Sequence, residues 1–77
     1  MRLVAVTWED ACEIDTTPWA YLEETEYECK TVVQVGWVVE ETEKYIVLTH
    51  AHTQGQVARR NLIPRSSITK IVTLQYE

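Results

Sequence analysis

Cysteine, glycine, proline and phenylalanine are scarce in this 77-residue sequence, which has two cysteines, two glycines, two prolines and no phenylalanine. Two cysteines are too few for the disulfide framework of a small secreted domain. No apolar run reaches the roughly 18 residues that a membrane-spanning helix needs, and Glu9 follows Met1 too closely for a signal peptide. We therefore expect one domain over residues 1–77, in the cytoplasm, with free thiols and no membrane contact.

Basic residues are almost missing from the first half of the chain. Residues 1–43 carry eleven of the twelve carboxylates against only Arg2 and Lys30, which gives a net charge of −9, whereas residues 44–77 carry a net charge of +4. If folding keeps the two halves apart, such a split can steer a partner or favour head-to-tail self-association. Simple solvation of the charged groups is the alternative interpretation.

Runs rich in valine, isoleucine and aromatic residues recur along the sequence with turn residues between them, which predicts β-strands. The predicted strands cover residues 3–8, 29–40, 45–50, 57–63 and 68–74. Gly36 interrupts the longest run and predicts a bulge or bend. Gly55 predicts a positive φ angle in the second hairpin loop, and Pro64 predicts a 3₁₀-like turn before the last strand.

The segment between the first two strands has a different character. Thr17 and Pro18 are typical of a helix start, so we expect a short helix or irregular excursion near residues 17–25. A helix there would place Trp19 and Leu22 on one side. The predicted fold is therefore all-β, a small five-stranded barrel with this excursion between its first and second strands.

Two barrel families resemble this pattern. The sequence NLIPRSSI at 61–68 resembles the end of Src-homology-3-like domains, and residues 36–40, 45–48 and 63–71 resemble the bacterial Sm-like RNA chaperones. Both resemblances imply a small five-stranded barrel. The clustered aromatic residues of the first family's peptide groove and the Tyr-Lys-His signature of the second are absent here.

Four stretches also resemble a group of small proteins of tailed bacteriophages and prophages. They are VGWV at 35–38, YIVL at 45–48, IPRSSITK at 63–70 and a Val-x-Trp-x-Asp-Ala element at 6–11. This resemblance implies a phage accessory protein in the cytoplasm of the host cell. This resemblance implies no known activity, and no functional residue can be assigned from it.

An acidic segment with aromatic residues is the strongest candidate for a binding surface. Trp19 lies in the least regular part of the sequence, where an exposed aromatic side chain could anchor an interface. A dense array of carboxylates suits a basic groove on a host protein. The predicted protein-interaction residues are Trp19, Glu23, Glu24, Glu26 and Glu28. We expect a non-enzymatic protein-protein interaction module that binds or inhibits a host protein and can also act as a homo-oligomer. We keep a phage structural or assembly component as an alternative.

The second half offers an alternative, an Sm-like nucleic-acid (RNA) binding module. Its candidate residues are Arg59, Arg60, Arg65 and Lys70, which could bind phosphates in a strip. Arg59 and Arg60 are neighbours, so they point to opposite faces unless the strand is bent.

Metal binding and catalysis find less support in the sequence. His50 and His52 have a spacing that metal sites use, but the sixteen residues between Cys12 and Cys29 fit no zinc motif. No nucleophile, histidine and acid stand in a catalytic arrangement, and no glycine-rich phosphate loop is present. We therefore expect no metal, no cofactor and no enzymatic activity.

Overall fold

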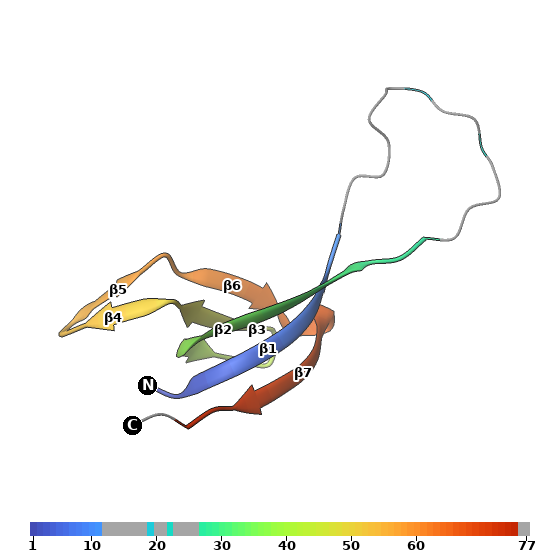
Figure 1. Ribbon diagram of the computed structural model, residues 1–77. Helices are drawn as coiled ribbons and strands as arrows, with labels where there is room; N and C mark the ends of the chain where they lie inside the picture. The colour runs from blue at the N-terminus through green and yellow to red at the C-terminus, as the bar shows by residue number, and fades with distance from the viewer. Residues whose placement is uncertain (12–18, 20–21, 23–26, 76–77) are drawn as a thin grey trace.

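The computed structural model describes residues 1–11, 19, 22 and 27–75 and is all-β (Figure 1). Its elements in chain order are β1 (Leu3–Asp10), β2 (Lys30–Glu41), β3 (Tyr45–Thr49), β4 (Ala51–Thr53), β5 (Gln56–Ala58), β6 (Asn61–Pro64), the 3₁₀ turn η1 (Arg65–Ser67) and β7 (Ile68–Thr73). None of the helical segments in these ranges has the length and hydropathy to cross a bilayer. The all-β class and the 3₁₀ turn before the last strand are confirmed.

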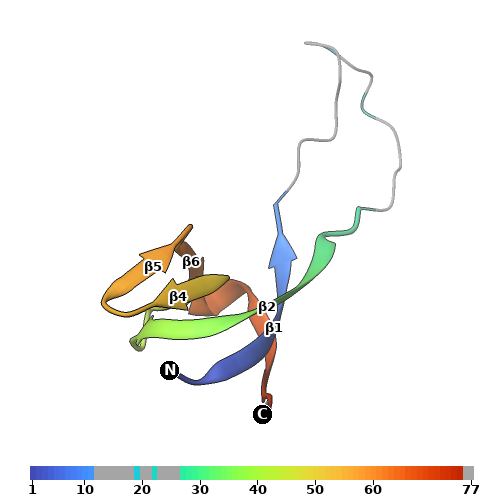
Figure 2. The ribbon, with the colours of Figure 1, turned by 60° about the vertical axis from the view of Figure 1, so that its left-hand side comes forward.

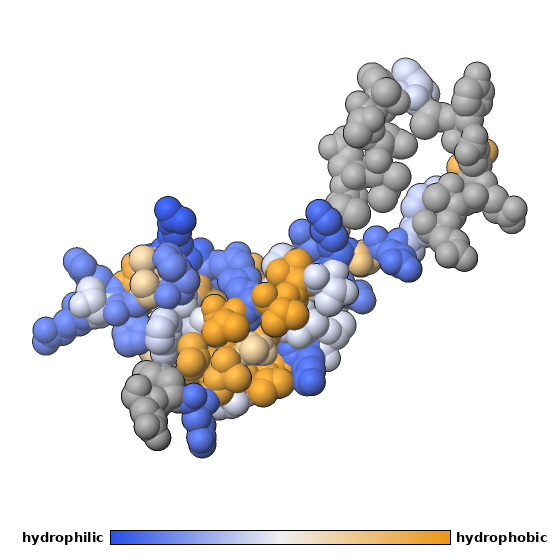
Figure 3. All heavy atoms as spheres, viewed as in Figure 1, coloured by the Kyte–Doolittle hydropathy of each residue, from blue (hydrophilic) through white to orange (hydrophobic). Residues whose placement is uncertain are grey.

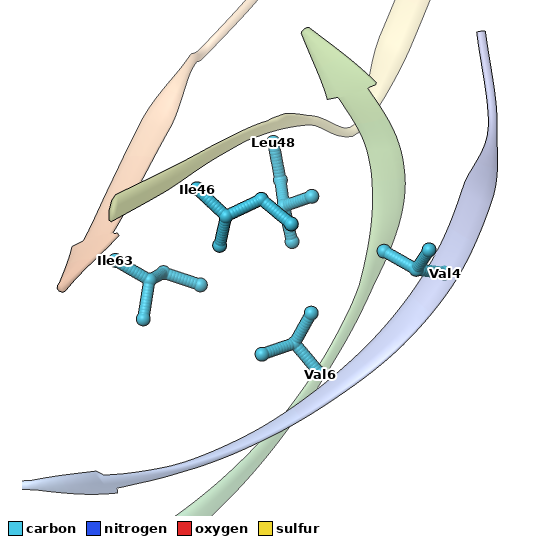
Figure 4. Close-up of a cluster of buried hydrophobic side chains, with 5 residues drawn as sticks. All are labelled: Val4, Val6, Ile46, Leu48 and Ile63. Atoms are coloured by element: carbon cyan, nitrogen blue, oxygen red, sulfur yellow. The ribbon is translucent and has the colours of Figure 1, made fainter. Parts of the chain in front are cut away.

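Five strands form one antiparallel sheet in the order β6-β3-β2-β1-β7, and β4 and β5 form a separate hairpin. β6 and β7 lie at opposite edges of the sheet although only η1 separates them along the chain. Strands lie about 4.8 Å apart, so a flat sheet would hold its edges about 19 Å apart. The step from Pro64 to Ile68 spans at most about 14 Å. The sheet must therefore curve strongly, and Figure 4 shows its strands bending around the core.

The core lies on the concave side of this curved sheet. Its fully buried side chains are Val4, Val6, Ile46, Leu48 and Ile63, from β1, β3 and β6 (Figure 4). The partly buried Trp8, Val38, Ile68 and Ile71 pack around them. Alternation along β1 explains the arrangement, because residues two apart in a strand point to the same face.

The predicted barrel is seen only as a curved open sheet, and most of the predicted helix lies outside the described residues. Among the described residues no ladder joins β6 to β7, so the structure holds an open five-stranded sheet and a hairpin, and no closed barrel is detected. β6 is only four residues long and ends at Pro64, which has no N–H to donate to a further ladder. The helix or excursion near residues 17–25 lies outside the described residues except for Trp19 and Leu22, which belong to no helix or strand.

One local prediction was wrong, and one of the two alternatives stated for Gly36 is excluded. The predicted strand over residues 57–63 is broken, because Arg59 has a φ of 49° and separates β5 from β6. Gly36 marks no bulge, since it pairs in register with Val4, and the shift in β2 falls between Val38 and Glu40. A side chain is excluded at Gly36 for another reason. A Cβ atom there would lie 2.8 Å from the carbonyl oxygen of Thr49.

Candidate functional site

The convex side of β2, β1 and β7 carries a row of aliphatic side chains. Val4 and Val6 are fully buried in the core, so Ala5 between them points outward. The register pairs Ala5 with Val35 on β2 and with Val72 on β7, and paired residues lie on the same face of a sheet. Three neighbouring strands thus present one aliphatic row to solvent.

Residues farther along the same strands extend this row. Val33 lies two residues before Val35, and Leu3 lies two residues before Ala5, so both share the outward face. Val33 is 66%, Val35 53% and Val72 40% exposed. We refer to Leu3, Ala5, Val33, Val35 and Val72 as the apolar outer face, and Figure 3 shows hydrophobic side chains gathered over β1, β2 and β7. Contiguous apolar surface of this kind typically marks an interaction site.

Our reading of the sequence did not identify the apolar outer face as a site, although a signal for it was present. A strand with one solvated face alternates between apolar and polar residues. In β2, residues 32–39 contain five valines and a tryptophan, which occupy both faces. Apolar side chains on both faces of a strand are shielded from water only when each face packs against something. A single small core packs against only one of the two faces.

The predicted acidic segment begins at the end of β1 and ends at the start of β2, so both of its ends lie at the same end of the sheet. Asp10, at the end of β1, pairs with Lys30, at the start of β2. The connection over residues 11–29 therefore leaves and re-enters the sheet at neighbouring positions. It contains six carboxylates and no lysine or arginine. Long connections of this kind are often functional.

The structure describes two of the five predicted protein-interaction residues. Trp19 is 90% exposed, as its predicted role requires, and Glu28 is also exposed. Glu23, Glu24 and Glu26 lie outside the described residues. Tyr27 beside Glu28 is 65% exposed. The described part of the connection thus combines exposed aromatic and acidic side chains.

Glu41 joins two arginines at the turn between β2 and β3. Arg2 Nη2 lies 2.6 Å from Glu41 Oε2, and Arg65 Nη2 lies 3.1 Å from Glu41 Oε1. The hydrogen bond from Arg2, with its charge and the contacts from Arg65, holds the pKa of Glu41 below its usual value of 4.5 against a partial desolvation that raises it. Arg65 Nε also donates to the Thr42 carbonyl oxygen at 3.1 Å. Arg65 therefore fastens η1 to this turn.

The four predicted nucleic-acid-binding residues do not form one strip. Arg59 and Arg60 precede β6 and Arg65 follows it, so about 13 Å of strand separates them. Lys70 lies on β7, at the opposite edge of the sheet from β6. Arg65 is already engaged with Glu41. Only Arg59 and Arg60 remain together as exposed cations.

The two histidines lie at the hairpin, where His52 has a packing role. Its ring meets the ring of Trp37 edge to face, with centroids 4.8 Å apart and an interplanar angle of 85°. In the described ranges, no group of three or more His, Cys, Asp or Glu residues is placed to hold a metal ion. Cys29 is exposed, and Cys12 lies outside those ranges.

Comparison with known proteins gives no relative for this arrangement. The chain matches no protein-family model, no curated protein and no solved structure. Its function therefore has to be argued from its own residues.

Proposed function

We propose that this protein is a non-enzymatic protein-protein interaction module. The apolar outer face is the observation that carries the proposal. A quarter of the chain is charged, yet Val33 and Val35 on β2 and Val72 on β7 stand exposed on the two sides of β1. Hydrogen-bonded strands hold these side chains in fixed positions, so binding needs little further ordering.

The charges beside the face indicate the chemistry of the partner, with one exposed cation, Lys70, paired with Thr7 on the same face and acidic groups at the end of β1. Glu9 shares the outer face of β1 and is exposed at the end where the connection over residues 11–29 begins. Asp10 follows it at the end of β1, and the sequence of the connection adds six carboxylates. A matching partner presents an apolar patch bordered by lysine and arginine, and complementary charge would speed their encounter and fix their orientation.

The apolar contacts alone give a modest affinity. Burying the exposed parts of Val33, Val35 and Val72 would stabilise a complex by roughly 2–3 kcal/mol, which corresponds to about 30–150-fold in the dissociation constant. A specific complex needs more than this. The exposed Trp19 on the acidic connection supplies the second anchor in this proposal.

The wider identity is proposed on the resemblances and on the strand order. We place the protein among phage accessory proteins that act on a host protein, with an Src-homology-3-like or Sm-like barrel as its scaffold. Support for the barrel comes from the curved sheet, whose edge strands are joined by η1. In addition, Asn61 Nδ2 donates to Gln34 Oε1 at 2.9 Å and draws β6 toward the first half of β2.

Affinity capture from host lysate tests the proposal. The bait is the wild-type protein, beside Val35→Glu on the apolar outer face and Thr53→Glu on the exposed hairpin as a control with the same added charge. We expect a discrete host protein with wild type and with Thr53→Glu, and its loss with Val35→Glu. Equal capture by both variants would refute the role of the face.

The mass of the protein in solution tests whether it forms a homo-oligomer. Sedimentation of the purified protein is expected to give a monomer whose mass does not change in Val35→Glu. A wild-type dimer that Val35→Glu dissociates would show instead that a second copy covers the apolar outer face, and the host-protein proposal would then be wrong.

A further inference from the structure

The β4–β5 hairpin is a separate structural unit with a firm base. In both views it lies away from the end of β1 and the start of β2, on the other side of the main sheet's length (Figures 1 and 2). The buried Thr49 holds the base, because its Oγ1 lies 2.5 Å from the carbonyl oxygen of Ala58 and accepts the Ala58 N–H at 3.2 Å. The contact between His52 and Trp37 ties one face of the hairpin to β2.

The hairpin carries the apolar Ala51, Val57 and Ala58 beside exposed polar side chains, and exposed basic residues flank it. The exposed polar and basic residues of the hairpin and its flanks are His50, His52, Thr53, Gln54, Gln56, Arg59 and Arg60. No aspartate or glutamate occurs between Lys44 and Tyr76. The amide and hydroxyl groups near the tip of the hairpin can both donate and accept hydrogen bonds. The cations Arg59 and Arg60 lie at its base, directly after β5.

The two arginines lie in a corner of unusual backbone conformation. Arg59 is the only non-glycine residue with positive φ among the described residues, at 49°. A side chain in this region costs about 1 kcal/mol or more relative to glycine. Such strain is often retained at functional sites. The left-handed turn also interrupts the alternation of the strand, which frees Arg59 and Arg60 from the opposite-face arrangement of a regular strand.

Two carboxylates of β2 make their contacts away from this corner. Glu41 is held by Arg2 and Arg65, and Glu40 accepts a hydrogen bond from the Tyr45 hydroxyl at 2.8 Å. Both lie near the start of β3, whereas the hairpin follows its end. In the described residues, neither Arg59 nor Arg60 makes an ion pair.

The geometry points to a binding site for duplex DNA, with the hairpin entering the major groove. That groove is about 12 Å wide and about 8.5 Å deep and admits a two-stranded β-ribbon. Two strands about 4.8 Å apart fit its width, and three residues of strand reach about 10 Å, enough for its depth. Thr53, Gln54 and Gln56 then face base edges. Arg59 and Arg60 contact phosphates on the groove wall.

Fluorescence anisotropy with a short labelled DNA duplex tests this site at several salt concentrations. Two phosphate contacts predict a slope of about −1.8 in log K against log salt, which is about a tenfold loss of affinity between 50 and 200 mM. Arg60→Ala is expected to halve the slope. Lys70→Ala removes one exposed cation elsewhere on the molecule and is expected to leave the slope unchanged.

Arg59→Gly separates binding from folding. Glycine adopts the φ of 49° without strain, so this variant is expected to melt at a higher temperature than wild type while it loses about half of the salt slope. A purely structural role of Arg59 would change stability and leave the slope as it is.

Several results would overturn the DNA site. They are no duplex binding by the wild type at about 50 mM salt, an equal effect of Lys70→Ala and Arg60→Ala, an unchanged slope in Arg59→Gly, and tighter binding to single-stranded RNA than to duplex. Val35→Glu is expected to bind DNA as wild type does. The site is thus tested independently of the proposed protein partner.

Discussion

Gly36→Ala is the substitution for which the structure gives the clearest expected effect on stability. The added Cβ would lie 2.8 Å from the carbonyl oxygen of Thr49 and 3.3 Å from Cβ of Leu48. The first neighbour is backbone, so β3 would have to shift away from β2. Overpacking of this kind costs about 1–3 kcal/mol, and the lower entropy of the unfolded alanine variant offsets about 0.5–1 kcal/mol of it.

The net expected loss in the free energy of unfolding is about 1–2 kcal/mol, which lowers Tm by roughly 5–15 °C in a chain of this size. Thermal unfolding followed by circular dichroism measures it. Gly55→Ala is the control, because Gly55 has a φ of 74° and no atom within 4 Å of an added Cβ. Asparagine should recover stability at position 55, where only conformation matters, and not at position 36. A Gly36→Ala variant as stable as wild type would refute the close approach of β3.

Two further predictions concern the charged turn and the core. Arg2 and Arg65 hold the pKa of Glu41 below 4.5, so their ion pairs stabilise the fold above that pH and the effect is lost as pH falls through the lowered pKa. Glu41→Gln should therefore lower the urea midpoint at pH 7, with a difference from wild type that shrinks in strong acid and in high salt. Ile63→Ala should cost about 2–5 kcal/mol in urea unfolding, because Ile63 is 1% exposed. The adjacent Leu62→Ala should cost no more than about 1 kcal/mol, because Leu62 is 54% exposed, and equal losses would contradict the assigned strand faces.

The strands of the main sheet were largely predictable because their residues have a strong β preference. Valine-rich runs located β1 and β2, and Pro64 located the 3₁₀ turn at residues 65–67. Strand β4 was missed, because residues 51–56 were predicted as a hairpin loop, and β5 was predicted to continue into β6. The sequence did not indicate the positive φ angle of Arg59, because such an angle is rare for a residue that is not glycine, asparagine or aspartate.

The candidate sites were less predictable, because they depend on pairing register. Sequence placed apolar residues on both faces of β2, but the exposed row appears only when Val35, Ala5 and Val72 are aligned across three strands. The basic residues show the opposite case. The four basic residues are near each other in the sequence, which favours a shared patch. The ion pair between Arg65 and Glu41 leaves Arg65 unavailable for such a patch.

Site-specific photocrosslinking tests the central claim, that the apolar outer face binds a host protein, most directly. A photoreactive amino acid at position 33 lies on the face, where Val33 is 66% exposed. The same group at position 54 lies on the exposed hairpin turn. Illumination in host cells is expected to give one discrete protein adduct from position 33, lost when Val35→Glu is added, and no such adduct from position 54. Identical adducts from both positions, or an adduct from position 33 that survives Val35→Glu, would contradict the account.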